Sequence, residues 1–167
     1  MKCDRDLNAE AQRGLGDVHI NVSDGVMSLN PETLSKMLSS SFSKYGEVDV
    51  AYLFGSRARG DFTEESDLDF AILLSRNFND PYDFVRLIAD LAMALGVKDE
   101  KINLVVLNDA SLELAYKVIS EGIIIYERNF EKRVDFEVNT LKFYLDFKPV
   151  LDQMRKSLVE EYMNGEA

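Results

Sequence analysis

From residue 30 onward, apolar residues follow helix-like and strand-like spacings in turn. The first helix is expected between Asn30, which suits an N-cap, and Gly46, which suits a C-terminal cap, with Pro31 at its first position. Its apolar residues recur at helical spacing: Leu34, Met37, Leu38 and Phe42. Further helices are expected from Asp80-Pro81 to Gly96 and over 111–121.

Four apolar runs between these helices are typical of buried strands. They cover residues 48–54, 67–74, 102–107 and 123–126. From Phe130 the pattern is helical again, and Pro149 predicts a kink or a split into helices of 130–147 and 150–163. This order indicates an α/β fold, a small mixed sheet with flanking helices.

We divide the chain into three parts on this pattern. Residues 1–29 are expected to form an irregular N-terminal extension, with Met27 as an alternative start. Residues 30–127 would form the α/β domain, and 128–167 a helical C-terminal extension packed on it.

Composition narrows the classes of partner. A net charge of −11 opposes binding to a long nucleic acid but leaves a single nucleotide open, since metal ions can neutralise its phosphates. No apolar run approaches the roughly 20 residues that span a membrane. The single cysteine, Cys3, favours the cytoplasm, and the single histidine, His19, excludes a metal site built on several histidines.

Asp67 and Asp69 are the main candidates for chemistry. They are two residues apart on an expected strand, so their carboxylates share one face and repel each other. A divalent cation such as Mg²⁺ would relieve this repulsion and could act on a phosphate. The alternative is a solvent-exposed pair at a strand edge.

Gly55 and Ser56 follow the first strand directly. Glycine permits a tight turn and a close backbone approach to a ligand, and a helix beginning at Ser56 would direct N–H groups at an anion. A plain turn at the end of the strand is the alternative.

Together these motifs resemble a known family. Gly55-Ser56, ten intervening residues and Asp67-x-Asp69 resemble the signature of polymerase-β-like nucleotidyltransferases. The segment "LFGSRARGDFTEESDLDFAILL" resembles the minimal nucleotidyltransferase (MNT) branch, as do "INLVVLNDASLELAYKVISEGIIIYER" and "RVDFEVNTLKFYLDFKPVL" further on.

The resemblance implies a function. Gly55 and Ser56 would hold the triphosphate of ATP, Asp67 and Asp69 would bind one or two Mg²⁺ ions, and Ser56 would join both aspartates in catalysis. In MNT antitoxins, AMP is transferred from ATP to a tyrosine of a partner HEPN-type ribonuclease toxin. The competing interpretation is a weak or inactive module that neutralises its partner by stoichiometric binding, and transfer to a small molecule is a third. Homo-oligomerisation stays open.

Three further residues near the motifs could serve either the site or the local structure. Arg57 and Arg59 would neutralise phosphate, or form surface pairs with the acidic segment "DFTEESD". Ser66 would orient the loop before Asp67, or be a simple turn residue.

The third carboxylate of the family corresponds to Asn103 in this chain. An amide has no charge and cannot act as a base near neutral pH, which puts turnover in question. Asp49 and Asp109 are the candidate substitutes. Three aromatic residues of the last helical segment, Phe136, Tyr144 and Phe147, are candidates for a partner surface.

Overall fold

A computed structural model describes residues 30–63, 65–163 and 165. The expectations for residues 1–29, including Met27, Cys3 and His19, therefore lie outside the described residues.

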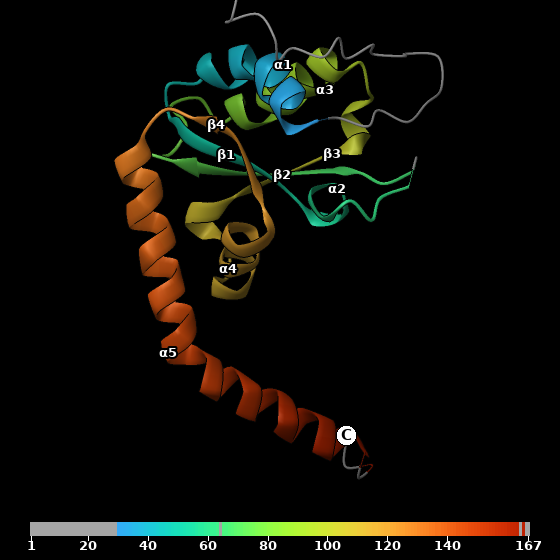
Figure 1. Ribbon diagram of the computed structural model, residues 1–167, viewed down its shortest axis with the longest axis vertical. Coiled ribbons are helices and arrows are strands. Elements are labelled where there is room, and N and C mark those ends of the chain that lie inside the picture. The colour runs from blue at the N-terminus through green and yellow to red at the C-terminus, as the bar shows by residue number, and fades with distance from the viewer. Residues whose placement is uncertain (1–29, 64, 164, 166–167) are drawn as a thin grey trace, which may run out of the picture.

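Four strands form one mixed sheet in the order β3-β2-β1-β4 (Figure 1). The strands are β1 (Val48–Phe54), β2 (Leu68–Leu74), β3 (Ile102–Val106) and β4 (Ile123–Glu127). β1 is antiparallel to both of its neighbours, whereas β2 and β3 run parallel. A parallel pair needs a long crossover, and α3 (Asp83–Leu95) supplies it. The expected α/β fold with a small mixed sheet is confirmed.

Helices cover both faces of the sheet. α1 (Pro31–Ser43) and α3 lie on one face, and α4 (Leu112–Glu121) and α5 (Phe130–Met163) on the other (Figure 1). The remaining helical elements are short: α2 (Gly55–Arg59) and two 3-10 turns, Asp99–Lys101 and Leu107–Asp109.

The sheet separates two hydrophobic layers. Phe42, Phe70 and Leu91 are fully buried between the sheet and the α1–α3 pair. Tyr52 and Val118 are buried on the α4–α5 side. Each such side chain contributes roughly 1.5–3 kcal/mol through burial, so both layers hold the strands in place.

The Tyr52 hydroxyl connects the second layer to α5. It donates a hydrogen bond to Glu137 Oε1 over 2.9 Å, and burial raises the pKa of Tyr52 well above its usual range. A neutral phenol is therefore maintained beneath α5, fixing the first turns of that helix against the sheet.

Helix ends agree with the sequence pattern at some positions only. The Asn30 side chain caps α1 by accepting from the Glu32 N–H at 3.0 Å, as expected. The expected cap at Gly46 is wrong, because α1 ends at Ser43 with Lys44 as its cap. α3 begins at Asp83 rather than at Pro81, because Asp80 accepts from the Tyr82 N–H and forms a turn first.

The expected split at Pro149 is also wrong. α5 is one helix of 34 residues that contains Pro149, and it bends along its length (Figure 1). Proline removes one N–H donor and bends the axis, but helical structure continues on both sides. The first half of α5 packs beside α4, and the second half extends away from the sheet (Figure 1). None of the described helices has the length and apolar character needed to cross a membrane.

A buried ion pair ties the start of β1 to the end of β4. Asp49 is 1% exposed, and its Oδ1 lies 2.7 Å from Nη2 of Arg128. The backbone carbonyl of Asp49 also accepts from the Arg128 N–H at 2.7 Å. The Arg128 side chain remains 37% exposed, so water solvates part of the pair.

We predict that Arg128→Ala lowers the free energy of unfolding by about 2 kcal/mol, because it leaves a buried carboxylate without its partner. In an Asp49→Asn background the same substitution should cost about 0.5 kcal/mol or less. Urea denaturation of the four variants measures this coupling. Equal costs in both backgrounds would show that the ion pair contributes nothing.

Candidate nucleotide and metal site

The candidate site lies where β1 ends and β2 begins. Phe54, the last residue of β1, is opposite Asp69 in the antiparallel register. Gly55 and Ser56 follow as the first residues of α2. This pairing brings the glycine-serine motif next to the aspartates, as the spacing of the motifs requires.

Gly55 is fixed by close approach as well as by backbone conformation. Its φ is +74°, and an added Cβ would lie 2.1 Å from Oδ2 of Asp69. A side chain at position 55 would therefore displace the Asp69 carboxylate. Ser56 lies next along α2 and is half-buried.

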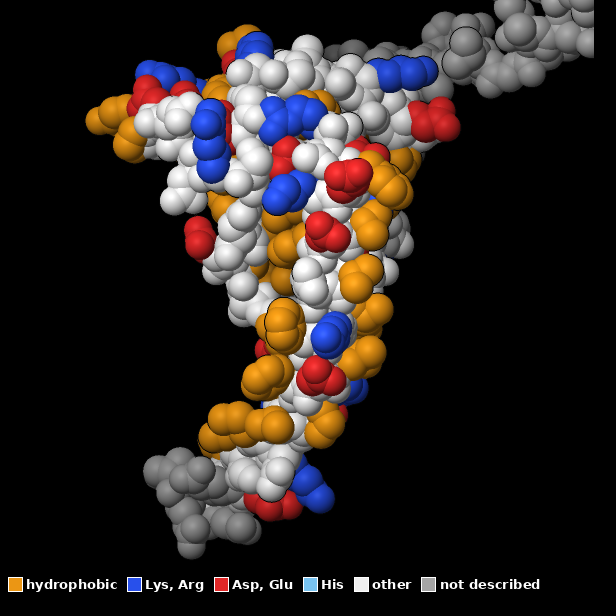
Figure 2. Space-filling view, turned by 90° about the vertical axis from the view of Figure 1, so that its left-hand side faces the viewer, with side chains coloured by type: hydrophobic (Ala, Val, Ile, Leu, Met, Phe, Trp, Pro, Cys, Tyr) orange, Lys and Arg blue, Asp and Glu red, His pale blue; other side chains and the backbone are white. Residues whose placement is uncertain are grey.

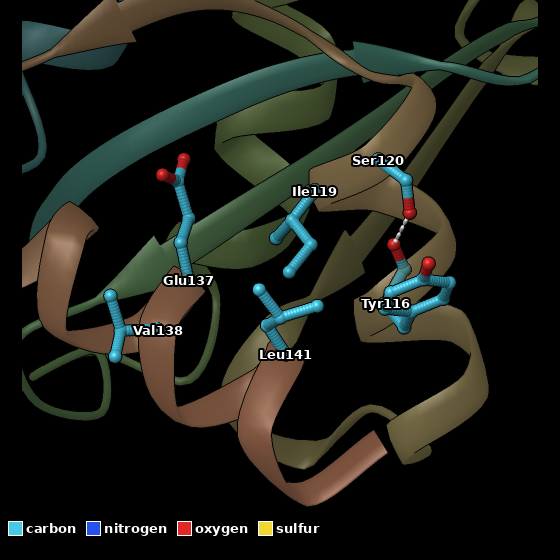
Figure 3. A pocket seen from close by; sticks show the side chains of 6 residues that line it. All are labelled: Tyr116, Ile119, Ser120, Glu137, Val138 and Leu141. Atoms are coloured by element: carbon cyan, nitrogen blue, oxygen red, sulfur yellow. Dashed lines mark hydrogen bonds between the residues drawn. The ribbon is translucent and has the colours of Figure 1, made fainter. Parts of the chain in front are cut away.

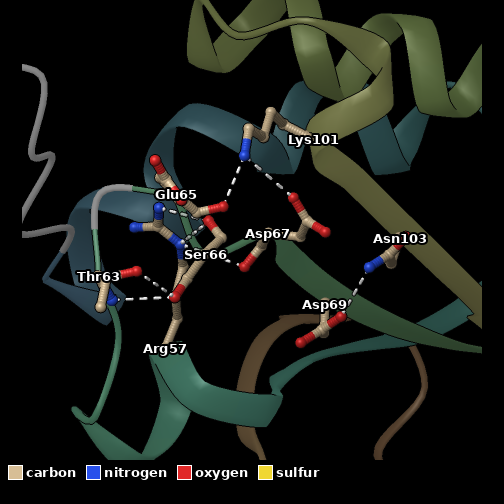
Figure 4. Close-up of polar contacts among 8 residues, drawn as sticks. All are labelled: Arg57, Thr63, Glu65, Ser66, Asp67, Asp69, Lys101 and Asn103. Carbon is tan, nitrogen blue, oxygen red and sulfur yellow. Dashed lines mark hydrogen bonds and ion pairs between the residues drawn. The ribbon is translucent and has the colours of Figure 1, made fainter.

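Each aspartate faces a hydrogen-bond donor, Lys101 from the 3-10 turn directly before β3 and Asn103 from β3 itself (Figure 4). Lys101 Nζ lies 3.3 Å from Oδ1 of Asp67. Asn103 Nδ2 donates to Oδ1 of Asp69 at 3.0 Å. The parallel register pairs Asp69 with Asn103, so an amide lies beside Asp69 at the position predicted to correspond to the third carboxylate.

Arg57 holds the loop that leads to Asp67. Its guanidinium donates to the backbone carbonyls of Ser66, at 2.9 Å, and Asp67, at 3.3 Å, and lies 5.0 Å from the centre of the Phe62 ring. Burial lowers the pKa of Arg57 from its usual value. These contacts fix the backbone beside the carboxylates, and a direct phosphate contact stays a prediction.

Arg59 and Ser66 occupy the surroundings of the site. Arg59 pairs with Asp61 at 3.2 Å and with Glu121 at 3.4 Å, which matches the surface-pair interpretation. The Ser66 hydroxyl accepts from the Thr63 N–H at 2.9 Å and closes the turn before Asp67 (Figure 4).

Neither substitute carboxylate reaches the aspartates. Asp49 lies at the start of β1, about 17 Å along the strand from Phe54, and is paired with Arg128. Asp109 lies in the 3-10 turn beyond the end of β3, whereas Asn103 lies at its beginning.

Lys101 was missed by sequence reasoning. It lies two residues before Asn103, as Asp67 lies two residues before Asp69. This equal spacing becomes informative only when β2 and β3 are known to be parallel and in register.

The donor chemistry suits Mg²⁺ held together with a nucleotide. Both carboxylates are partly exposed, and Mg²⁺ uses one or two carboxylates, several waters and substrate phosphates. Among residues 30–63, 65–163 and 165, no group of three Asp, Glu, His or Cys side chains is close enough to hold a metal ion. Phosphate and water would therefore have to complete the coordination shell.

The expected strand start at Asp67 is one residue early, because β2 begins at Leu68. A mixed sheet that presents a glycine-serine turn to two aspartates at the start of a neighbouring strand defines a nucleotidyltransferase-type site. The family model described as "Polymerase beta, Nucleotidyltransferase" matches residues 36–131. The chain belongs to this family.

Individual relatives point to one branch of the family. The chain is 27% identical to the protein adenylyltransferase MntA of Shewanella oneidensis, over 83% of this chain and 91% of the relative. It is 29% identical to the protein adenylyltransferase MntA of Aphanizomenon flos-aquae, over 62% of this chain and 73% of the relative. A crystal structure described as a toxin–antitoxin with AMP-PNP superposes with a TM-score of 0.59 at 27% identity, over 81% of this chain and 99% of that chain. The resemblance to the MNT branch is confirmed.

We predict that Gly55→Ala abolishes nucleotide binding, because the new Cβ displaces the Asp69 carboxylate. Gly60→Ala is the matched control: Gly60 has a φ of +80°, but nothing lies within 4 Å of an added Cβ. Both variants should lose about 1 kcal/mol of stability from backbone strain, and only Gly55→Ala should lose binding. Titration with a fluorescent ATP analogue and Mg²⁺ measures it, and equal binding by the two variants would contradict the prediction.

Proposed function

We propose that the protein is an MNT-type antitoxin that transfers AMP from Mg-ATP to a tyrosine of a partner HEPN-type ribonuclease toxin. The observation that carries this proposal is the close approach of the Gly55 backbone to the Asp69 carboxylate, with Asp67 two residues earlier, directly before β2. The names of the two MntA relatives and the toxin–antitoxin complex with AMP-PNP support it. Because the AMP comes from ATP, we place the reaction in the cytoplasm.

The residues of the candidate site would have different roles in the transfer. Gly55 and Ser56 would bind the triphosphate, and Asp67 and Asp69 would hold Mg²⁺, which stabilises charge on the phosphate and the leaving group. The tyrosine oxygen forms a bond to the α-phosphorus while the bond to pyrophosphate breaks. Asn103 cannot accept the tyrosine proton, so water or a group of the partner has to take it.

The second candidate function is neutralisation by stoichiometric binding. The neutral Asn103 favours it, because nucleotide binding would survive where transfer is slow. A long apolar surface on α5 also favours it, since binding without turnover requires a persistent interface.

This surface continues the side of α5 that packs on the domain. In the first half, Phe136 packs against the second hydrophobic layer, Thr140 is 6% exposed, and the Tyr144 ring stacks on Tyr116 at 3.6 Å. Phe136 and Tyr144 are thus engaged within the chain. The same helical spacing continues into the second half with residues that we call the α5 stripe: Phe147, Leu151, Met154, Leu158 and Tyr162.

The α5 stripe extends beyond the domain. Four of its members, Phe147, Met154, Leu158 and Tyr162, are more than half exposed. Figure 2 shows hydrophobic side chains along this part of the helix. A cavity of about 360 Å³ lies between α4 and α5 (Figure 3), lined by Tyr116, Ile119, Ser120, Glu137, Val138 and Leu141. Contiguous exposed apolar surface of this kind is typical of a protein interface.

We predict that the protein labels the product of its neighbouring gene when incubated with ATP carrying label on the α-phosphate and with Mg²⁺. Asp67→Asn and Asp69→Asn should each lower labelling at least 100-fold, because the cation loses a ligand. Asp61→Asn, a surface carboxylate paired with Arg59, is the control and should label normally.

Three results separate the candidates. Label on the partner's tyrosine supports transfer. No label with a folded, nucleotide-binding protein and an intact complex overturns the transfer proposal in favour of stoichiometric binding. If Asp67→Asn with Asp69→Asn abolishes toxin neutralisation but leaves the complex intact, stoichiometric binding fails.

We predict that Leu158→Glu weakens the complex with the partner at least tenfold, because it places a charge in the α5 stripe. Val159→Glu is the matched control, since Val159 is 61% exposed, compared with 64% for Leu158, but points about 100° away around the helix. Isothermal titration calorimetry measures both affinities. Equal weakening of the complex by the two variants would show that the α5 stripe is not the face of the helix that binds the partner.

A further inference from the structure

Lys101 lies in the candidate site, but the proposed transfer reaction gives it no role. Its Nζ donates to the backbone carbonyl of Glu65 at 2.5 Å and lies 3.3 Å from Oδ1 of Asp67 (Figure 4). Lys101 precedes β3 directly, and Asp67 precedes β2 directly, so the parallel register sets the two side chains next to each other.

This arrangement opposes a metal ion at Asp67. A Mg²⁺ ion binds carboxylate oxygen at about 2.1 Å, so an ion on Asp67 Oδ1 would lie within about 5.5 Å of the present Nζ position. Two like charges at that distance repel strongly in a partly desolvated site. The Lys101 ammonium must move before the cation can bind well.

The ion pair is weak enough to be displaced. The side chains of Lys101 and Asp67 are 43% and 44% exposed, and ion pairs at such exposure contribute little to stability. The long side chain of lysine lets its ammonium move to another anion nearby. The phosphates of a bound nucleotide would provide that anion.

Asn103 reduces the metal affinity of the other aspartate. Its amide donates to Asp69 Oδ1 at 3.0 Å and adds no negative charge. With Lys101 next to Asp67, the two carboxylates and the ammonium carry a net charge of −1. Such a site offers too little negative charge to hold divalent ions tightly by itself.

We propose that Lys101 is a positioning residue that makes metal binding depend on the nucleotide. Without nucleotide, Lys101 occupies the place beside Asp67 and keeps divalent cations out. With nucleotide, Lys101 would pair with a phosphate, and Asp67 and Asp69 would then be free to hold one Mg²⁺ that binds together with the triphosphate. This inference rests on the proposed function insofar as the ligand is a nucleoside triphosphate.

The test compares Lys101→Gln with Lys98→Gln. Lys98 is exposed, lies three residues earlier and carries the same charge, so its substitution controls for the change in net charge. Mn²⁺ binding to the full chain is measured by electron paramagnetic resonance, first with Mn²⁺ alone and then with a non-hydrolysable ATP analogue. Urea denaturation of both variants checks that they fold.

We expect Lys101→Gln to tighten the binding of Mn²⁺ alone about tenfold and to weaken the binding of the Mn²⁺–analogue complex about tenfold. Lys98→Gln should change neither by more than about twofold. The wild type should bind one Mn²⁺ per nucleotide. A merely structural role for Lys101 would not shift the two affinities in opposite directions.

Other results overturn the proposal. If Lys101→Gln and Lys98→Gln behave alike while the analogue binds, Lys101 has no such role, but the proposed function stands. Tight binding of two Mn²⁺ ions by the wild type without nucleotide would also show that Lys101 does not control metal binding, and it would leave the proposed function standing. If neither the wild type nor the variants bind the analogue, the proposal and the nucleotide function both fail.

Discussion

The antiparallel pairing of β1 with β2 is the constraint on which the site depends. It places Phe54 opposite Asp69, so the turn that leaves β1 meets the carboxylate that enters β2. The contact is so close that position 55 admits glycine alone, since a Cβ would lie 2.1 Å from the Asp69 carboxylate oxygen. The thirteen-residue connection between the strands, residues 55–67, then has to be held in one conformation. The Arg57 guanidinium contributes to this by donating to the backbone carbonyls of Ser66 and Asp67.

The parallel pairing of β2 with β3 decides the charge of the site. It sets residues 101 and 103 beside residues 67 and 69. The charges of residues 101 and 103 therefore determine, together with the two aspartates, the net charge of the site. A carboxylate at position 103 would have added negative charge, and a neutral residue at 101 would have left Asp67 free. This chain has an amide and an ammonium instead. Both choices act in the same direction, toward weaker binding of a bare cation and greater reliance on the charge of the ligand.

The sequence predicts the parts of this structure that local patterns control. Apolar runs identify all four strands, and the spacing of Gly55 from Asp67 and Asp69 identifies the motif pair. What it could not predict depends on pairing between distant segments. Lys101 looks like a surface residue until the β2–β3 register is known, and Asp49 is a plausible metal ligand until Arg128 is found beside it. At Pro149 only the predicted split is wrong, and for a different reason: a proline bends a helix locally but does not end it when helix-forming residues continue on both sides.

The candidate site and the α5 stripe are physically separate, and this separation bears on how the proposed function can vary. The aspartates lie where β1 ends and β2 begins, whereas the α5 stripe extends beyond the domain on a helix held by Tyr144 and by the Tyr52–Glu137 hydrogen bond. Weakening the metal site by an amide at position 103 therefore leaves the apolar face of α5 unchanged. If the α5 stripe binds the proposed partner, a chain with this layout would keep that capacity while its capacity for transfer fell. Stoichiometric neutralisation is thus the outcome that the fold reaches most directly when catalysis weakens, and both candidate functions follow from one architecture.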